Sequence, residues 1–169
     1  MEFDQLLRPE RPWLRVLVAT ESDACDLRAA LSEDPTAGVV FRVVRGQKAR
    51  TKPALFDEFA GALQFPLYFG ENWDAFDECL ADLSWLPGDA YVLLFVQSIH
   101  LLDKEPADEI QRLLKILEKV AEEWSSSKQR PNPRPPRPFH VLLQCTKKEE
   151  PALRAKLTAA KASFDVLHL

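Results

Sequence analysis

The sequence predicts an α/β domain with a mainly parallel sheet, on the strength of two observations. Short apolar runs alternate along the chain with longer segments whose apolar residues recur at helical spacing. Such alternation is typical of strand–helix–strand units, whose successive strands run parallel. In addition, the run at 91–97 is apolar almost throughout, as in strands that are covered on both faces. We therefore expect roughly four or five strands, with helices packed on the sheet in two or three layers.

The expected strands are rich in β-branched, aromatic or other apolar residues, and they lie at residues 13–19, 39–45, 91–97, 139–145 and 163–169. The expected helices have apolar residues at helical spacing, and they lie at residues 22–33, 53–63, 73–83, 106–124 and 149–162. Ser22 is the expected N-cap of the first helix, and Pro53 is the expected first residue of the second. Helix 106–124 has acidic residues in its first turn and the clearest apolar stripe.

Residues 125–138, SSSKQRPNPRPPRP, are rich in proline and in basic side chains. Proline lacks a backbone donor and is excluded from helix interiors and central strands. We therefore expect a long exposed loop, extended or partly disordered, before strand 139–145. A ligand for a proline-recognition domain is the alternative interpretation of this segment.

The composition is typical of a soluble protein, with 46% hydrophobic and 28% charged residues, and we expect one domain over residues 1–169. No apolar run reaches the roughly 20 residues that cross a bilayer, and the first residues do not resemble a secretory signal. We therefore expect a cytoplasmic protein that does not bind a membrane. Cys25, Cys79 and Cys145 form no metal-binding pattern, and we expect reduced, buried thiols.

The charges are distributed unevenly along the chain. Between Lys52 and Lys104 there are nine acidic residues and no lysine or arginine, although the net charge of the whole chain is only −4. A nucleic-acid-binding surface would have the opposite sign, so we expect no direct contact with nucleic acid. The acidic block suits a basic protein partner, and an acidic face exposed only to water is the alternative interpretation.

Residues 68–83, YFGENWDAFDECLADL, combine an apolar face with an acidic face. The apolar face carries residues at helical spacing, namely Trp73, Phe76, Leu80 and Leu83. Asp74, Glu78 and Asp82 recur every four residues on another face, and Asp77 adjoins them. Like charges at this spacing repel by a few tenths of a kcal/mol per pair, a cost that a cationic partner would turn into binding energy. A solvent-exposed helix that merely lacks basic residues is the alternative.

Two residues shape the loop before this helix, since Gly70 permits a tight or positive-φ turn and Asn72 can cap the helix. No catalytic or metal-binding pattern accompanies the carboxylates. The histidines, at positions 100, 140 and 168, are scattered, and neither a nucleophile motif nor a glycine-rich phosphate loop is present. We therefore expect no catalytic residue, no metal and no cofactor, with a hydrolase that uses Asp74 and Glu78 as a third-ranked hypothesis.

This segment resembles the barstar family, whose pattern is Pro-x-Tyr-Tyr/Phe-Gly-x-Asn-x-Asp-Ala, followed by acids and a Cys-Leu pair. Here the pattern runs from Pro66 to Ala75 and is followed by Glu78, Cys79 and Leu80. The resemblance implies a barstar-like fold with a core at about 39–145, built on three strands, namely 39–45, 91–97 and 139–145. Residues 1–38 and 146–169 would add a βα unit and an αβ unit. Cysteines that can pair in some family members make a disulfide bridge an alternative to three reduced thiols.

The resemblance further implies an inhibitor, or immunity protein, that blocks the active site of a basic, secreted barnase-type ribonuclease. A ribonuclease holds RNA phosphate with cationic side chains, and carboxylates can accept the same charge-assisted hydrogen bonds. Glu78 would enter the phosphate site, Asp74 would pair with a second cation, and Tyr68 would pack against the active-site histidine. The expected partner-binding residues are Tyr68, Gly70, Asn72, Asp74, Asp77, Glu78 and Asp82.

Two departures from the family pattern concern this surface. Glu78 is one methylene longer than the family's aspartate, and Asp77 replaces a bulky aromatic residue. Both favour an alternative function, a barstar-like binding module for a different basic protein. The family also contributes an acid from the next helix, and the sequence does not choose among the candidates there, namely Glu118, Glu122 and Glu123.

Overall fold

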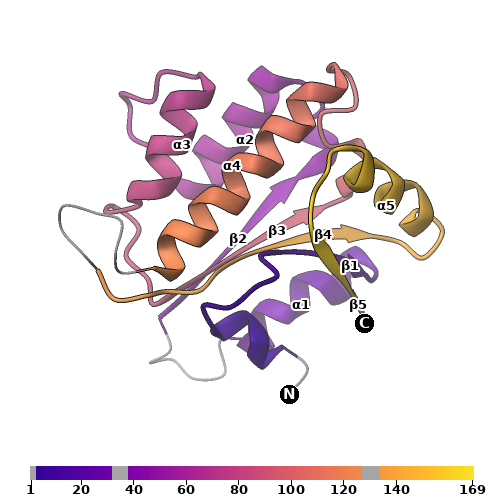
Figure 1. Ribbon diagram of the computed structural model, residues 1–169, viewed down its shortest axis with the longest axis horizontal. Helices are drawn as coiled ribbons and strands as arrows, with labels where there is room; N and C mark the ends of the chain where they lie inside the picture. The colour runs from indigo at the N-terminus through magenta and orange to yellow at the C-terminus, as the bar shows by residue number, and fades with distance from the viewer. Residues whose placement is uncertain (1–2, 32–37, 127–133) are drawn as a thin grey trace.

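A computed structural model describes residues 3–31, 38–126 and 134–169 (Figure 1). Within this part of the chain, five strands form one sheet in the order β2-β3-β4-β1-β5, and every strand pair is parallel. The strands are β1 (Leu14–Val18), β2 (Val39–Arg45), β3 (Ala90–Val96), β4 (Phe139–Cys145) and β5 (Phe164–His168). The predicted α/β class and parallel sheet are thus confirmed.

The helices cover both faces of the sheet and produce three layers (Figure 1). One face is covered by α1 (Glu21–Leu31), and the short 3-10 helix η1 (Asp4–Leu7) packs on the same face. The helices on the other face are α2 (Lys52–Leu63), α3 (Trp73–Asp82), α4 (Ala107–Ser125) and α5 (Glu150–Ala159). Two further 3-10 helices, η2 (Gly46–Lys48) and η3 (Ser98–His100), follow β2 and β3.

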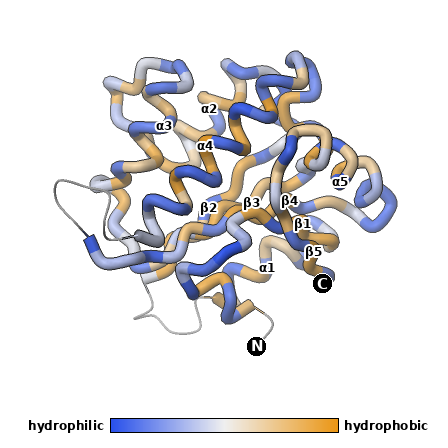
Figure 2. Tube along the Cα trace, in the orientation of Figure 1, coloured by the Kyte–Doolittle hydropathy of each residue, from blue (hydrophilic) through white to orange (hydrophobic). Residues whose placement is uncertain are grey.

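Burial explains why the apolar runs form strands. Every residue of β3 and β4 is buried, because helices cover both faces of these central strands. Along α4, hydrophilic and hydrophobic residues alternate at helical spacing (Figure 2), and the apolar residues pack toward the sheet. Within the described residues, no helix is long and apolar enough to cross a membrane.

Several local expectations need correction. Thr20, rather than Ser22, accepts the capping hydrogen bond from Asp23 N–H at 3.1 Å, and α1 therefore begins at Glu21. Pro53 is the second residue of α2, because the helix begins at Lys52 behind the Thr51 cap. Residues 32–33 of the first expected helix and residues 127–133 of the expected loop lie outside the described residues.

One of the three cysteines also differs from expectation. All three thiols are free, but Cys25 is exposed on α1, whereas Cys79 and Cys145 are buried. Burial raises the pKa of the Cys145 thiol to about 11, and nearby Glu149 and Glu150 contribute to this rise. A thiol with a raised pKa is a weak nucleophile, which is typical of a structural cysteine.

Candidate partner-binding surface

The loop before α3 holds two large side chains out in solvent. Phe65 and Phe69 pack with their ring centroids 5.0 Å apart, and Phe69 N–H donates to the Pro66 carbonyl at 2.9 Å. These contacts turn the intervening side chains outward, so that Leu67 is 107% exposed and Tyr68 is 76% exposed. Tyr68, expected from the sequence to touch a partner, is therefore accessible.

Asn72 caps the start of α3, as the sequence predicts. Its Oδ1 atom accepts a hydrogen bond from Ala75 N–H at 2.9 Å, and its Nδ2 group donates to the Gly70 carbonyl at 3.1 Å. The positive φ in this turn occurs at Glu71, with a value of 51°, and not at Gly70. A Cβ atom on Gly70 would lie 3.1 Å from Asn72 Nδ2, so a larger residue there would press on the capping side chain.

Trp73 anchors the first turn of α3 to α4. Its Nε1 group donates to Glu109 Oε2 at 2.8 Å, and Lys52 Nζ lies 3.6 Å from the same oxygen. Glu109 is only 9% exposed, so these two partners compensate the burial of its charge. Sequence reasoning missed this contact, because an acid in the first turn of a helix is already explained by the helix dipole.

The last turn of α3 is held by Trp124 and Arg134. Trp124 Nε1 donates to the Leu80 carbonyl at 2.9 Å, and the Arg134 guanidinium donates to the carbonyls of Ala81 and Asp82 at 3.1 and 3.4 Å. The same guanidinium lies over the Trp124 ring. These donors satisfy carbonyls that a helix end leaves without intrahelical partners, so α3 is fixed at both ends.

Three carboxylates line the outer face of α3, on Asp74, Glu78 and Asp82. All three side chains reach solvent, and within the described part of the chain none of these carboxylates forms a hydrogen bond or an ion pair. The helix dipole stabilises the negative charge of Asp74 alone among the three, because only Asp74 lies in the first turn. A cation from another molecule can therefore bind this row without first breaking an internal ion pair.

A cavity of about 250 Å³ lies beside this row. It is lined by three aromatic side chains, two carboxylates, a thiol and a methyl group, namely Tyr68, Phe69, Trp85, Glu78, Asp82, Cys79 and Ala75. Burial raises the pKa of the Cys79 thiol, and the carboxylates of Asp82 and Glu78 raise it further. Aromatic rings combined with carboxylates provide a suitable environment for a cationic side chain.

A family model described as Barstar (barnase inhibitor) matches residues 39–144, which is more than half of the chain. This chain belongs to the barstar family. The barstar match includes the loop, α3 and α4, and it leaves β1, α1, α5 and β5 outside. By its description, the family is one of inhibitors rather than enzymes.

No curated protein matches the chain. Among solved structures, a chain of the "Structure of Drosophila ORC bound to DNA" is similar, with a TM-score of 0.53 and 14% sequence identity. The alignment covers 99% of the present chain but only 27% of the Drosophila chain. An identity this low shows a shared fold alone.

Asp77, where the barstar pattern has an aromatic residue, differs from the other acids of α3. Its Oδ2 atom lies 2.6 Å from Lys119 Nζ of α4, and its side chain is only 23% exposed. The hydrogen bond to Asp77 raises the pKa of Lys119, whose ammonium also lies 3.6 Å from Glu123 Oε1. Asp77 is therefore engaged within the molecule, and Lys119 bounds the acidic surface on the α4 side.

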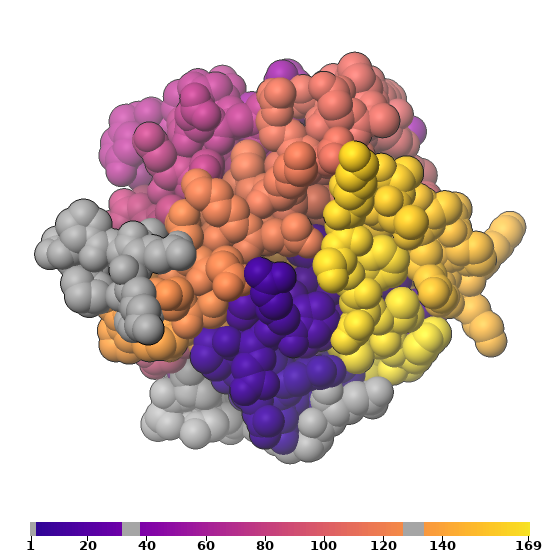
Figure 3. All heavy atoms as spheres, in the orientation of Figure 1, coloured from indigo at the N-terminus to yellow at the C-terminus, as the bar shows by residue number. Residues whose placement is uncertain are grey.

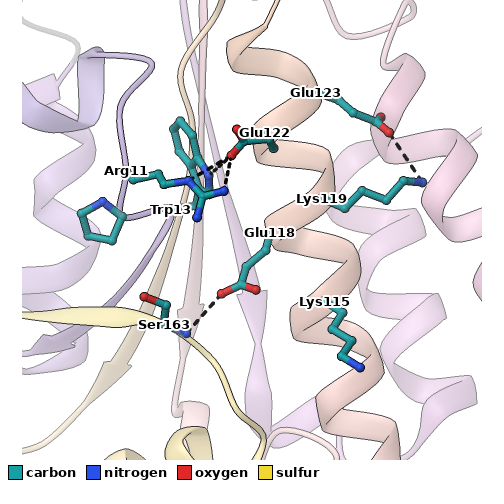
Figure 4. Close-up of a pocket in the computed structure, with 9 residues that line it drawn as sticks. Arg11, Trp13, Lys115, Glu118, Lys119, Glu122, Glu123 and Ser163 are labelled. Atoms are coloured by element: carbon teal, nitrogen blue, oxygen red, sulfur yellow. Dashed lines mark hydrogen bonds and ion pairs between the residues drawn. The ribbon is translucent and has the colours of Figure 1, made fainter. Parts of the chain in front are cut away.

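The α4 acids that the sequence left as candidates are all engaged as well. Glu122 accepts hydrogen bonds from Arg11 and Trp13, and Glu118 accepts one from Ser163 N–H at 3.2 Å (Figure 4). These residues border a hollow of about 420 Å³ where α4 meets segments from both ends of the chain (Figure 3). Glu118 and Glu122 thus connect α4 to segments outside the barstar match.

The histidines do not form a catalytic group. His140 is buried, with Nδ1 at 2.9 Å from Arg15 Nη1 and Nε2 at 2.8 Å from the Arg8 carbonyl. Burial, aided by the nearby Arg15 charge and partly opposed by the hydrogen bond to the Arg8 carbonyl, lowers the pKa of His140 to about 4. Among the residues that the structure describes, no cluster of histidine, cysteine and carboxylate side chains could hold a metal ion.

Proposed function

We propose that this chain inhibits a basic, barnase-type ribonuclease by placing the carboxylates of α3 over its phosphate-binding site. The observation that carries this proposal is the solvent-facing row of Asp74, Glu78 and Asp82, which is unpaired among the described residues and lies within the segment that matches the barstar family. A ribonuclease must hold phosphate with cationic side chains, and carboxylates can take the place of the phosphate oxygens.

Each side chain of the surface has a role in this proposal. Glu78, beside the cavity, would enter the phosphate site, and Asp74 would pair with a second cation at its rim. Tyr68 would pack its exposed ring against the active-site histidine of the ribonuclease. Asn72 and Gly70 would hold the loop in the conformation that presents Tyr68. The inhibitor would act by occupancy alone, without catalysis, metal or cofactor.

The proposal extends to the biological setting of the chain. An inhibitor of a secreted ribonuclease protects the producing cell when it meets the enzyme inside the cytoplasm, as an immunity protein does. Residues 1–169 would form one domain, in which the terminal βα and αβ units extend the sheet of the family core. The pairing of β1 with both β4 and β5 supports this arrangement.

Titration calorimetry against a barnase-type ribonuclease tests the proposal, with RNA cleavage followed in parallel. We expect stoichiometric binding and loss of cleavage at one inhibitor per enzyme. A ribonuclease encoded beside this chain is the first choice of enzyme. Absence of binding to both that enzyme and a generic barnase-type enzyme would exclude the proposed function.

Association with a basic ribonuclease is expected to slow down as the salt concentration rises. The α3 carboxylates face solvent, and salt screens exposed charges with a Debye length of about 10 Å at 0.1 M. Electrostatic steering mainly affects the association rate constant. Stopped-flow mixing at two ionic strengths measures this rate, and a rate independent of salt would contradict steering by the acidic face.

A second candidate function is a barstar-fold module that binds another basic protein. The Asp77–Lys119 ion pair favours it, because a cation and a neutralised acid occupy the α4 side of the surface. The Drosophila ORC structure is bound to DNA, but the likeness to it is one of fold, and the acidic face of α3 would repel a phosphate backbone. A pull-down with a basic protein that is not a ribonuclease, competed by an α3 charge variant, distinguishes this candidate.

Replacing Lys119 with alanine is expected to accelerate association with a barnase-type ribonuclease by a few-fold. The substitution removes a positive charge beside the acidic row and frees the Asp77 carboxylate. The free energy of unfolding should fall by about 1–3 kcal/mol, because the substitution removes the cation that pairs with the largely buried Asp77 carboxylate. Stopped-flow kinetics measure the effect, with Lys115→Ala, an exposed lysine four residues earlier on α4, as the matched control. An equal acceleration in both variants would show that only the net charge matters.

A further inference from the structure

Leu67 is the most exposed large apolar residue in the described part of the chain. Its relative exposure of 107% compares with 76% for its neighbour Tyr68, 50% for Leu169 and 39% for Leu7. An apolar side chain in water loses the free energy that burial would provide, and exposed apolar groups next to one another often mark an interaction site. Leu67 and Tyr68 form such a pair at the tip of the loop before α3.

The backbone on both sides of this pair is fixed. Phe69 packs edge-on against Phe56, with ring centroids 5.7 Å apart, and against Phe65 on the other side of the loop tip. The hydrogen bond from Phe69 N–H to the Pro66 carbonyl closes the turn between them. Leu67 is therefore presented in a defined position, which reduces the entropy that a partner must remove on binding.

The surroundings of the pair indicate which surface would cover it. Tyr68 lines the same cavity as Glu78 and Asp82, whose carboxylates are unpaired within the described residues. On the α4 side of the row, Lys119 adds a positive charge and pairs with Asp77. The surface that favours a cationic partner therefore extends from the acidic row toward the loop tip, and not toward α4.

We infer that the partner is a basic protein in which an apolar recess adjoins the cations, and that this recess receives Leu67. The requirement for cations on the partner rests on the proposed function. The apolar recess is expected whether the partner is a ribonuclease or another basic protein. Leu67 then determines specificity. It selects partners by an apolar contact that the carboxylates cannot provide.

Two short peptides of equal lysine content test this inference without a ribonuclease, one with leucines and one with serines at the remaining positions. Each is titrated into the labelled full-length protein, and NMR shift changes of the α3 and loop amides give the affinities. We expect roughly tenfold tighter binding of the leucine peptide, as the burial of a leucine side chain provides. The largest shift changes should occur at Leu67 and Tyr68.

Variants localise the preference to one side chain. Leu67→Asn should abolish the preference for the leucine peptide and leave binding of the serine peptide unchanged, whereas Leu67→Met should retain the preference. Leu169→Asn, at another exposed leucine, should behave like the original protein. Equal affinities for the two peptides, or a preference that survives Leu67→Asn, would overturn the inference. A ribonuclease that fails to bind would exclude the proposed function and leave this peptide result intact.

Discussion

Glu78→Ala is expected to weaken binding to the target ribonuclease by about 2–5 kcal/mol, which is a loss of roughly thirtyfold to several thousandfold in affinity. Magnitudes of this kind are known for buried charge pairs at protein interfaces, and the barnase–barstar pair itself is among the measured cases. The physical reason is that the Glu78 carboxylate would accept hydrogen bonds from cations that have lost their water. Without it, those cations stay buried and unpaired.

Calorimetry measures this effect, and thermal unfolding shows whether it acts through the fold. Glu78 has no partner among the described residues, and it lies four residues from both Asp74 and Asp82. Its removal relieves two repulsions, so the unfolding temperature should be unchanged or slightly higher. Asp26→Ala, at an exposed acid of α1 on the other face of the sheet, makes the same change in net charge. Equal loss of binding in both variants would refute a specific role for Glu78.

The sequence predicted the strands well because burial dominates them. The expected ranges 39–45 and 139–145 coincide with β2 and β4, and the first, third and fifth strands differ by one or two residues. The strand order was not predictable. The insertion of β1 between β4 and β5 depends on contacts between residues more than a hundred positions apart, for which hydrophobic periodicity carries no information.

Helix boundaries were harder to predict where two capping residues compete. Thr20 and Ser22 are both suitable caps, and Thr20 prevails because its hydroxyl accepts from Asp23 N–H at 3.1 Å and donates to Asp23 Oδ2 at 2.7 Å. Cys25 was misplaced because free cysteines are usually buried. The buried positions of α1 are Ala24, Leu27 and Leu31, and Cys25 lies outside this face.

The sequence predicted the features of the candidate surface that depend on neighbouring residues, but not those that depend on residues far apart in the chain. The Asn72 cap, the apolar face of α3 and the acidic row follow from spacing within one segment. The pairing of Asp77 with Lys119 joins residues that are 42 positions apart, and the engagement of Glu122 by Arg11 spans 111 positions. Which acids stay free for a partner therefore depends on packing, and a count of charges along the sequence does not reveal it.

Phe76→Ala is expected to have the largest effect on stability, a loss of about 3–5 kcal/mol in the free energy of unfolding. Phe76 is 0% exposed, and its ring centroid lies 4.7 Å from that of Phe59 and 5.5 Å from that of Trp73. Truncation to alanine leaves a cavity between α2 and α3 that these rings cannot fill. Because domains are stable by only about 5–15 kcal/mol, this loss is a large fraction of the total.

Urea unfolding measures the loss, and Phe76→Leu, which retains most of the apolar volume, should lose clearly less than Phe76→Ala. An unchanged unfolding midpoint for Phe76→Ala would contradict the packing described for α3. The substitution also distinguishes the contribution of helix packing from that of the charges, because it leaves every carboxylate of the surface in place. Under conditions where Phe76→Ala is still folded, electrostatic steering should persist in the association rate, whereas dissociation should be faster because α3 no longer holds its carboxylates in a fixed row.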